Sequence, residues 1–496
     1  MIGHSIVSAG KGNLNNHLIH SHSPNNEAGN KSGLGQDRPD LNSPETDKSI
    51  AFRRTQNARS NRRSFHNPNI KYFVKRAIEY AGALKSLNRA ATVVTDQMLG
   101  MNPGNLLRGS DPSSALQVLY GDNIVGHGTG GDDMVAIQAR LVTGYLAGAG
   151  DDLISIVAQK VSHVAGQAGD DTIAVTAETV EMLRGDNGDD MLAVTAKTIR
   201  QVDGGNGDDI ISVSAKKIKG VSGGGGDDVI AATGKYIGNV FSGDGDDRVV
   251  VSGQAANRVY GGGGDDIISV TARQVRNTGG GDGDDTISIT ASKVNYVNGD
   301  AGDDHISINA TGDLQAVNGG TGDDTINVTS NRIVQINGDA TLDKVDKYGD
   351  LYSDQPGGND TINVTTQHVG LVHGGGGDDV ISVNASSARN INGGTGDDVI
   401  NLDASVALVR MGLNAGDDIL HVQRAEYLTV SFAGAETDDI TISREGNSLT
   451  LTGPSGDTLQ INGLSNISQL LITGSDWEAQ GKFVQVSGDE NLDIIL

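Results

Sequence analysis

The residues best suited to chemistry in this 496-residue chain are pairs of adjacent acidic residues that recur at a fixed interval. Ten Asp-Asp pairs begin 19 residues apart, from Asp132-Asp133 to Asp303-Asp304. Six further copies follow at steps of 19 to 21 residues, apart from one insertion that precedes Asn359-Asp360. A fixed period of this length indicates stacked structural repeats. We therefore expect the pairs to lie directly above one another.

Stacked carboxylates need a counter-charge. Two of them about 5 Å apart repel by roughly 1 kcal/mol in water, and by about 3 kcal/mol at an effective dielectric constant near 20. Summed over sixteen layers, this repulsion rivals a typical free energy of folding. At neutral pH, we expect bound cations to offset this repulsion. Carboxylates with backbone carbonyls from glycine-rich turns form an all-oxygen site, which suits Ca²⁺ better than Zn²⁺ or Mg²⁺. The pattern predicts several bound calcium ions.

Catalysis has little support in the sequence. The eleven histidines share no repeat position, and no Ser-His-Asp or metal-binding histidine grouping is present. An acidic pair used sixteen times favours a structural role over a single active centre. The chain is therefore expected not to be an enzyme, although a polysaccharide-acting β-helix enzyme that uses residues 339–356 in a cleft stays open as an alternative.

The elements that must position the aspartates follow from one unit. Residues 286–291 alternate apolar and polar side chains, which is typical of a short strand. Val294 and Val297 are three residues apart, so the chain turns between them and both point inward. Each unit is a strand, a corner, a short strand and a glycine-rich turn. The sequence predicts an all-β fold, a parallel β-solenoid (β-roll- or β-helix-like) of about 16 coils over residues 116–440.

The regions outside the repeats have other compositions. Residues 1–67 are polar and are expected to be a disordered leader. In residues 68–115 we expect a capping helix over 69–99 followed by a linker. Residues 441–496 alternate again and predict a C-terminal β cap with a possible secretion signal. The insertion at 339–356 is acidic, and is either a solvated loop or an extra cation site.

Charge is distributed unevenly along the chain, whose net charge is −26. Residues 1–115 carry a net +7, with an arginine cluster between Arg53 and Arg63, and the remainder carries −33. The acidic array argues against nucleic-acid binding there and for inorganic cations as partners. No apolar run reaches transmembrane length. The first 30 residues show no Sec-type signal peptide. The absence of cysteine excludes disulfides.

The loop itself carries a family resemblance. Residues 204–212 match the phrase Gly-Gly-x-Gly-x-Asp-x-apolar-x at every position, as do 223–231, 261–269, 374–382 and 393–401. This phrase resembles the nonapeptide of RTX-type (haemolysin-type) calcium-binding repeat proteins. The resemblance implies that Ca²⁺ lies between consecutive turns, held by the sixth-position aspartate and backbone carbonyls.

The resemblance assigns these metal ligands: Asp133, Asp152, Asp171, Asp190, Asp209, Asp228, Asp247, Asp266, Asp285, Asp304, Asp324, Asp360, Asp379, Asp398 and Asp418. Asp439 fits less well, because Thr437 stands where glycine is expected. Each 19-residue coil holds one nonapeptide, whereas the usual β-roll has two per turn. We therefore expect a single calcium column along one edge.

The resemblance also implies a biological setting. It indicates a secreted, bacterial, calcium-binding protein that folds when calcium binds and serves in extracellular adhesion or interaction, with host-surface or matrix polysaccharide as a possible partner. Two export routes stay open. The acidic-apolar residues 493–496 resemble the end of type I substrates, whereas the Ser/Asn-rich start resembles a type III leader. The second route makes a host-delivered effector the alternative function.

Overall fold

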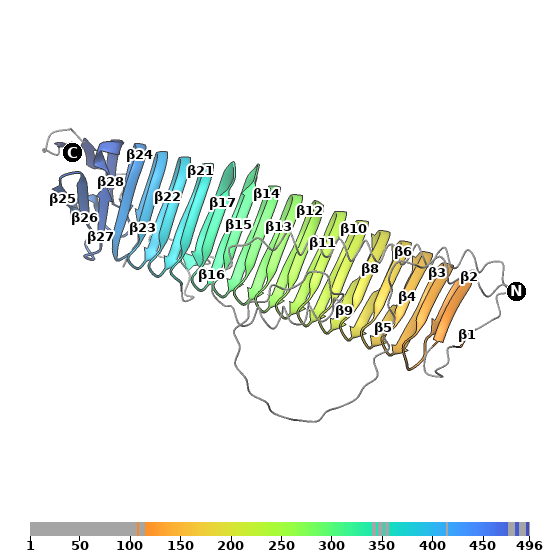
Figure 1. Ribbon diagram of the computed structural model, residues 1–496. Helices are drawn as coiled ribbons and strands as arrows, with labels where there is room; N and C mark the ends of the chain where they lie inside the picture. The colour runs from red at the N-terminus through yellow and green to blue at the C-terminus, as the bar shows by residue number, and fades with distance from the viewer. Residues whose placement is uncertain are drawn as a thin grey trace, which may run out of the picture. The chain divides into compact units, whose positions relative to one another are not determined.

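The computed structural model describes residues 107–108, 115–339, 344–345, 351–352, 357–412, 415–474, 482–485 and 493–495. These residues form an all-β protein whose main body is a parallel β-solenoid of about 16 turns. Figure 1 shows the coils stacked in chain order, with each strand beside its counterpart one repeat later. The fold class predicted from the 19-residue period is confirmed.

One coil is represented by β10 (Ile210–Gly225). Its inward side chains are Ile211, Val213, Ile218 and Val221, each at most 2% exposed, and they follow the alternation and the three-residue corner seen in the sequence. Polar residues between them face outward. The core is therefore a thin column of Ile, Val and Ala, which explains how a chain with 3% aromatic residues can bury enough apolar surface.

The coils pair in parallel and in register. Ile211 pairs with Ile230, and Ile230 pairs with Val249 one coil further on. The 16-residue strands β11 (Val229–Asp244), β12 (Arg248–Gly263), β13 (Ile267–Asp282) and β14 (Thr286–Ala301) continue this pairing. Because every coil repeats the same register, each position of the repeat forms a straight column along the solenoid.

The remaining solenoid strands extend the stack on both sides of these five. They are β2 (Ala115–His127), β3 (Met134–Ala149), β4 (Leu153–Val161), β5 (Val164–Ala168), β6 (Thr172–Val180), β7 (Leu183–Asn187), β8 (Met191–Ile199), β9 (Val202–Asn206), β15 (His305–Ala310), β16 (Asp313–Thr321), β17 (Thr325–Thr329), β18 (Arg332–Asp339), β21 (Thr361–Gly376), β22 (Val380–Thr395), β23 (Val399–Met411) and β24 (Asp417–Phe432).

The two ends differ from the array. At the first coil, β1 (Leu107–Arg108) pairs antiparallel with β2. At the other end, β25 (Thr441–Glu445), β26 (Ser448–Thr452) and β27 (Thr458–Asn462) form an antiparallel meander, and β27 and β28 (Ile467–Thr473) add to β24. The 3₁₀ turns η1 (Thr437–Asp439) and η2 (Leu464–Asn466) and the strands β29 (Lys482–Gln485) and β30 (Asp493–Ile495) complete the elements.

Several sequence predictions fall outside the described residues. These are the disordered leader at 1–67, the helix at 69–99, and most of the insertion at 339–356. Within the insertion, the described backbone forms a small antiparallel pair, β19 (Lys344–Val345) with β20 (Leu351–Tyr352). Among the helices of the described residues, none has the length and apolarity needed to cross a membrane.

Candidate metal site: a buried aspartate column

The two aspartates of each pair have opposite surroundings. In the coil that begins at Gly204, Asp208 is exposed whereas Asp209 is 0% exposed. Consecutive residues of an extended segment point to opposite sides, so one carboxylate faces water and the next faces the interior. Every one of the fifteen predicted ligand aspartates, from Asp133 to Asp418, is buried, with at most 3% exposure. We call them the buried column, and we call their exposed or half-buried neighbours the acidic edge.

Both sets are linked by backbone hydrogen bonds that run in opposite directions. In the buried column, the N–H of each aspartate donates to Oδ1 of the aspartate in the next coil, as from Asp209 to Asp228 at 2.7 Å. Fourteen such bonds of 2.7–2.9 Å join the column without a break. On the acidic edge the N–H of Asp227 donates backward to Oδ1 of Asp208 at 2.8 Å.

The second oxygen of the buried carboxylates has no such partner. Thirteen Oδ2 atoms, from Asp152 to Asp398, are inaccessible to water and accept no hydrogen bond within the described residues. A buried carboxylate oxygen without a partner is costly, because the charge has lost its hydration and gained nothing in return. In thirteen of these carboxylates, Oδ2 therefore lacks a hydrogen-bond donor or a cation.

Glycine allows the backbone to approach that free oxygen closely. A Cβ on Gly204 would overlap Oδ2 of Asp209 and would lie 2.6 Å from the carbonyl oxygen of Gly223 in the next coil. The same pair of oxygens, a carboxylate Oδ2 and a carbonyl of the following coil, borders the equivalent glycine in most other coils. Gly205 and Gly207 adopt φ values of +128° and +119°, which glycine takes at little cost. Most layers thus bring a carboxylate oxygen and a carbonyl oxygen of the next coil against the same glycine.

The electrostatics of the column agree with its burial. Loss of hydration raises the pKa of Asp228 to about 9 and that of Asp152 to about 6, against an ordinary value of 3.8. The backbone N–H that each carboxylate accepts lowers its pKa, and the negative charges of neighbouring aspartates raise it again. The protein alone therefore disfavours the ionised column at neutral pH.

The donor set fits a hard cation. Within the described chain, no three or more side chains of His, Cys, Asp or Glu converge on one point. Each layer contributes one buried carboxylate, so backbone carbonyls would have to supply most other ligands. Ca²⁺ accepts oxygen ligands of mixed type in flexible geometry, which Zn²⁺ and Mg²⁺ do less readily. The unpartnered Oδ2 atoms and the carbonyl oxygens beside them match these demands along a single edge.

The ends of the column depart from the repeat. Asp133 already accepts a hydrogen bond from the Thr129 N–H at 2.6 Å on Oδ2, and one from the Thr129 hydroxyl at 2.9 Å on Oδ1. Asp439 lies exposed in η1 and takes no part in the column. The first predicted ligand is thus satisfied by the protein itself, and the sixteenth Asp pair does not form a layer.

Coil-to-coil variation was not apparent from the motif search. Ser242 occupies the position of Gly204 in its coil, and its hydroxyl donates to the carbonyl of Gly261 at 3.2 Å. Burial still raises the pKa of Asp247 to about 6, but the hydrogen bond from the Asp228 N–H lowers it. Alignment of the 19-residue units would have revealed this substitution. The space beside Asp247 is therefore partly filled by a side chain.

The start of the insertion contains a further buried carboxylate. Asp339 is 3% exposed and accepts backbone N–H groups from Gly358 at 3.1 Å and from Gly376 at 2.7 Å. Burial raises its pKa, and these two donors lower it. Asp339 connects the chain before the insertion to the two coils after it. These two hydrogen bonds hold the chain before the insertion against the coils after it, and we call this arrangement the clamp at Asp339.

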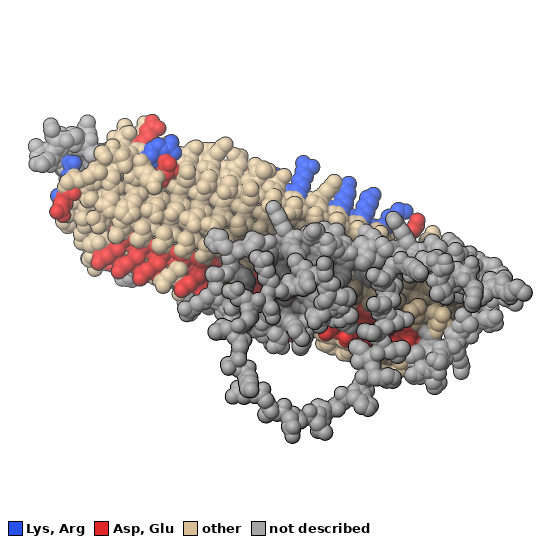
Figure 2. All heavy atoms as spheres, in the orientation of Figure 1, with Lys and Arg blue, Asp and Glu red and all other residues tan. Residues whose placement is uncertain are grey.

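Figure 2 shows the acidic side chains gathered along one margin of the solenoid, with lysine and arginine along the opposite margin. The comparisons with known proteins add no relative to this picture, since the chain matches no family model and no curated protein sequence.

Proposed function

We propose that this chain is a calcium-binding β-solenoid whose coils are held together by Ca²⁺ ions between successive Gly-Asp loops. The observation that carries the proposal is the row of thirteen buried Oδ2 atoms without hydrogen-bond partners. In most coils a glycine lies against this oxygen, beside a carbonyl of the next coil. Ca²⁺ supplies the charge that these oxygens lack, and the nonapeptide resemblance points to the same ion.

Binding and folding are coupled in this proposal. Each site is formed by two consecutive coils, so it does not exist in the unfolded chain. Where calcium is scarce, fifteen buried carboxylates oppose stacking of the coils. Where calcium is abundant, binding to the stacked state stabilises it by mass action. Such a chain stays unfolded and exportable at low calcium, and folds at the higher calcium of the cell exterior.

The biological role that follows is extracellular and non-enzymatic. A stiff acidic solenoid offers long repetitive surfaces, which suit adhesion or interaction with a host surface or matrix polysaccharide. The type I and type III routes are distinguished by deleting residues 1–67 and residues 486–496 separately and measuring export. The deletion that abolishes export identifies the end that is read.

The direct test is calcium titration of the full-length protein followed by circular dichroism and equilibrium dialysis. We expect β structure to appear cooperatively with calcium, with about one ion per buried layer, and to be lost on addition of a chelator. Magnesium at the same concentration is the control and should induce much less structure. A fully folded solenoid at neutral pH that binds no calcium would contradict the proposal.

A further inference from the structure

The middle of the solenoid carries a second, oppositely charged surface. Residues 191–298 contain eleven lysines and arginines, and all but Arg248 lie outside the Gly-Asp loops. Outside the loops, the same stretch contains one acidic residue, Asp203. We call the exposed cations at the corners of these coils the basic strip: Lys197, Arg200, Lys216, Lys217, Lys219, Lys235, Arg258, Arg273, Arg276 and Lys293.

Within the part of the chain that the structure describes, most of the basic strip has no anionic partner. At its N-terminal end Lys197 lies 3.5 Å from Glu178, and Arg200 lies 3.8 Å from Glu181. At its other end Lys293 lies 3.9 Å from Asp313. Between these ends the described residues contain no ion pair to a member of the strip. The centre of the strip is therefore a positive surface on an otherwise acidic protein.

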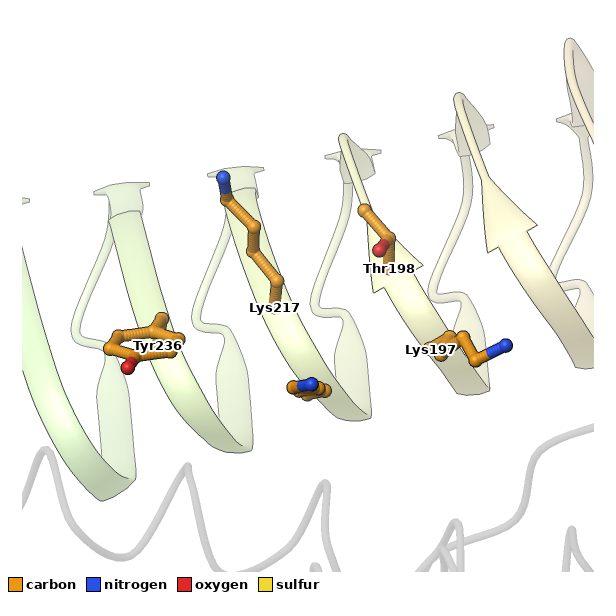
Figure 3. A pocket seen from close by; sticks show the side chains of 5 residues that line it. Lys197, Thr198, Lys217 and Tyr236 are labelled. Carbon is orange, nitrogen blue, oxygen red and sulfur yellow. The ribbon is translucent and has the colours of Figure 1, made fainter.

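The N-terminal part of the strip also contains a hollow. Lys197, Thr198, Lys216, Lys217 and Tyr236 line a shallow hollow of about 650 Å³. Thr198, Lys217 and Tyr236 occupy one column on three consecutive coils, as Figure 3 shows. Tyr236 is 48% exposed. A long partner lying along the solenoid axis could contact every one of these coils.

The acidic edge of another copy has the matching repeat. Its carboxylates recur once per coil, and the cations of the strip recur on the same coils, so both intervals equal the strand spacing of about 4.8 Å. When two copies lie side by side, the carboxylates of one therefore stay opposite the cations of the other over many layers. An anionic polymer with a different repeat would lose this register after a few units.

We infer that the acidic edge of one copy docks along the basic strip of a second copy. The two surfaces differ, so the contact is heterologous and leaves one free strip and one free edge in every pair. Further copies can then add on either side. This inference rests on the proposed function, because thirteen Ca²⁺ ions, one for each unpartnered Oδ2, would carry twenty-six positive charges and change the formal charge from −26 to zero. Calcium would thereby remove the repulsion between copies.

Two variants isolate the two surfaces. The strip variant reverses three exposed cations on one coil, Lys216→Glu, Lys217→Glu and Lys219→Glu. The edge variant replaces Asp208, Asp227, Asp246 and Asp265 by Asn. Asparagine is tolerated at this position, since Asn359 Oδ1 accepts the N–H of Asp378 at 2.7 Å in the native chain. The matched control reverses two exposed arginines outside the strip, Arg332→Glu and Arg389→Glu.

The experiment is sedimentation velocity of the full-length proteins in calcium at low ionic strength. We expect the wild type and the control to give a weight-average mass at least twofold above 51.2 kDa, and 1 M salt to dissociate them. Each surface variant alone should be a monomer. An equimolar mixture of the two should form pairs that grow no further, because one intact edge meets one intact strip.

Three results would overturn the inference: a monomeric wild type in calcium at low salt, association that survives in both variants, or a mixture that stays monomeric. A wild type that binds added polyuronate or DNA but not itself would identify a polyanion as the occupant instead. Circular dichroism on the same samples separates the two proposals. Calcium-induced folding without association removes this inference alone, whereas a solenoid indifferent to calcium removes the proposed function.

Discussion

Asp227 and Asp228 are adjacent in the chain and identical in chemistry, yet the structure gives them different roles. Asp227 is half-buried at the surface, and its Oδ1 accepts a hydrogen bond from the Asp246 N–H at 3.0 Å. Asp228 is completely buried, accepts the Asp209 N–H on Oδ1, and has no hydrogen-bond partner on Oδ2. A one-residue shift along an extended segment changes a solvated charge into a buried one.

The comparison shows that the two aspartates of each repeat serve different purposes. The acidic edge keeps the protein hydrated, and the buried column requires a counter-ion. The residue types Gly-Asp-Asp alone do not distinguish the two carboxylates, although the resemblance to the nonapeptide does. The direction of the side chain decides, and that direction is set by the strand that begins immediately after the pair.

The largest expected effect is that of pH on the calcium-free protein, because it acts on the whole column at once. Burial raises the pKa of these aspartates from 3.8 to values of about 6 for Asp152 and about 9 for Asp379. A raised native pKa gives stability that is present below about pH 4 and is lost as pH rises through 6–9. The urea concentration at the unfolding midpoint in calcium-free buffer should therefore decrease as the pH is raised from 5 to 9.

In the presence of calcium, stability should instead increase with pH. The buried aspartates lose their protons over the same pH range, and their carboxylates can then bind the ion. The calcium affinity should rise from pH 5 to 9. Calcium-free midpoints that increase with pH would show that the buried carboxylates do not govern stability.

Next in size is a matched pair of substitutions at adjacent residues. Asp228→Asn removes the charge from a proposed ligand, so one or two calcium ions should be lost. A site held at a calcium concentration 100-fold above its Kd contributes about 2.7 kcal/mol. Asp227→Asn should change stability by less than about 0.5 kcal/mol. Calorimetric calcium titration and thermal unfolding measure both.

The same pair should behave differently in a chelator. There Asp228→Asn relieves a buried charge and should stabilise the solenoid, whereas Asp227→Asn should again have little effect. Equal losses from both substitutions, with and without calcium, would show that the two positions are equivalent and remove the distinction.

A smaller effect is expected from the residue beside the free oxygen. Gly204→Ala places a methyl group against Oδ2 of Asp209 and should cost about 1–3 kcal/mol together with one calcium ion. Ser242→Gly makes the converse change and should add one ion. Equilibrium dialysis with radioactive calcium counts both. A stoichiometry unchanged in either direction would place the cation elsewhere.

The smallest effect concerns backbone strain in the same loop. Gln167 occupies the position of Gly205 and holds φ at +86° without being glycine. Gln167→Gly should relieve this strain and stabilise the native state by no more than about 1 kcal/mol, since glycine also gains freedom in the unfolded chain. Thermal unfolding in saturating calcium measures it, with Asn206→Gly as a control at a position of ordinary φ. Destabilisation by Gln167→Gly would show that the glutamine side chain contributes contacts that outweigh the strain.

Much of this architecture could be predicted because the repeat is so regular. The 19-residue period predicted the parallel stack, and the alternation in residues 286–291 with Val294 and Val297 predicted the inward side chains, which are at most 6% exposed where they were expected to be buried. The column of second aspartates could also be predicted, because the resemblance distinguishes the sixth position of the loop from the fifth.

Other features depend on contacts between coils that no single unit reveals. The capping of Asp133 by Thr129, the exposure of Asp439 and the clamp at Asp339 arise where the repeat starts, ends or is interrupted. The basic strip was missed for a different reason. Its residues are spread over six coils at corner positions, so they form a surface only after the coils are stacked.

The insertion before Asn359 shows what kind of change the solenoid accepts. The N–H of Asp324 reaches Oδ1 of Asp360 at 2.8 Å, although 36 residues separate them, so the ladder continues as if nothing had been added. Extra sequence placed at a loop therefore leaves the register between the flanking coils unchanged. Addition or removal of a whole 19-residue unit changes the length by one strand spacing and disturbs nothing on either side. The length of the solenoid and the sequence inserted into its loops can therefore change independently during evolution.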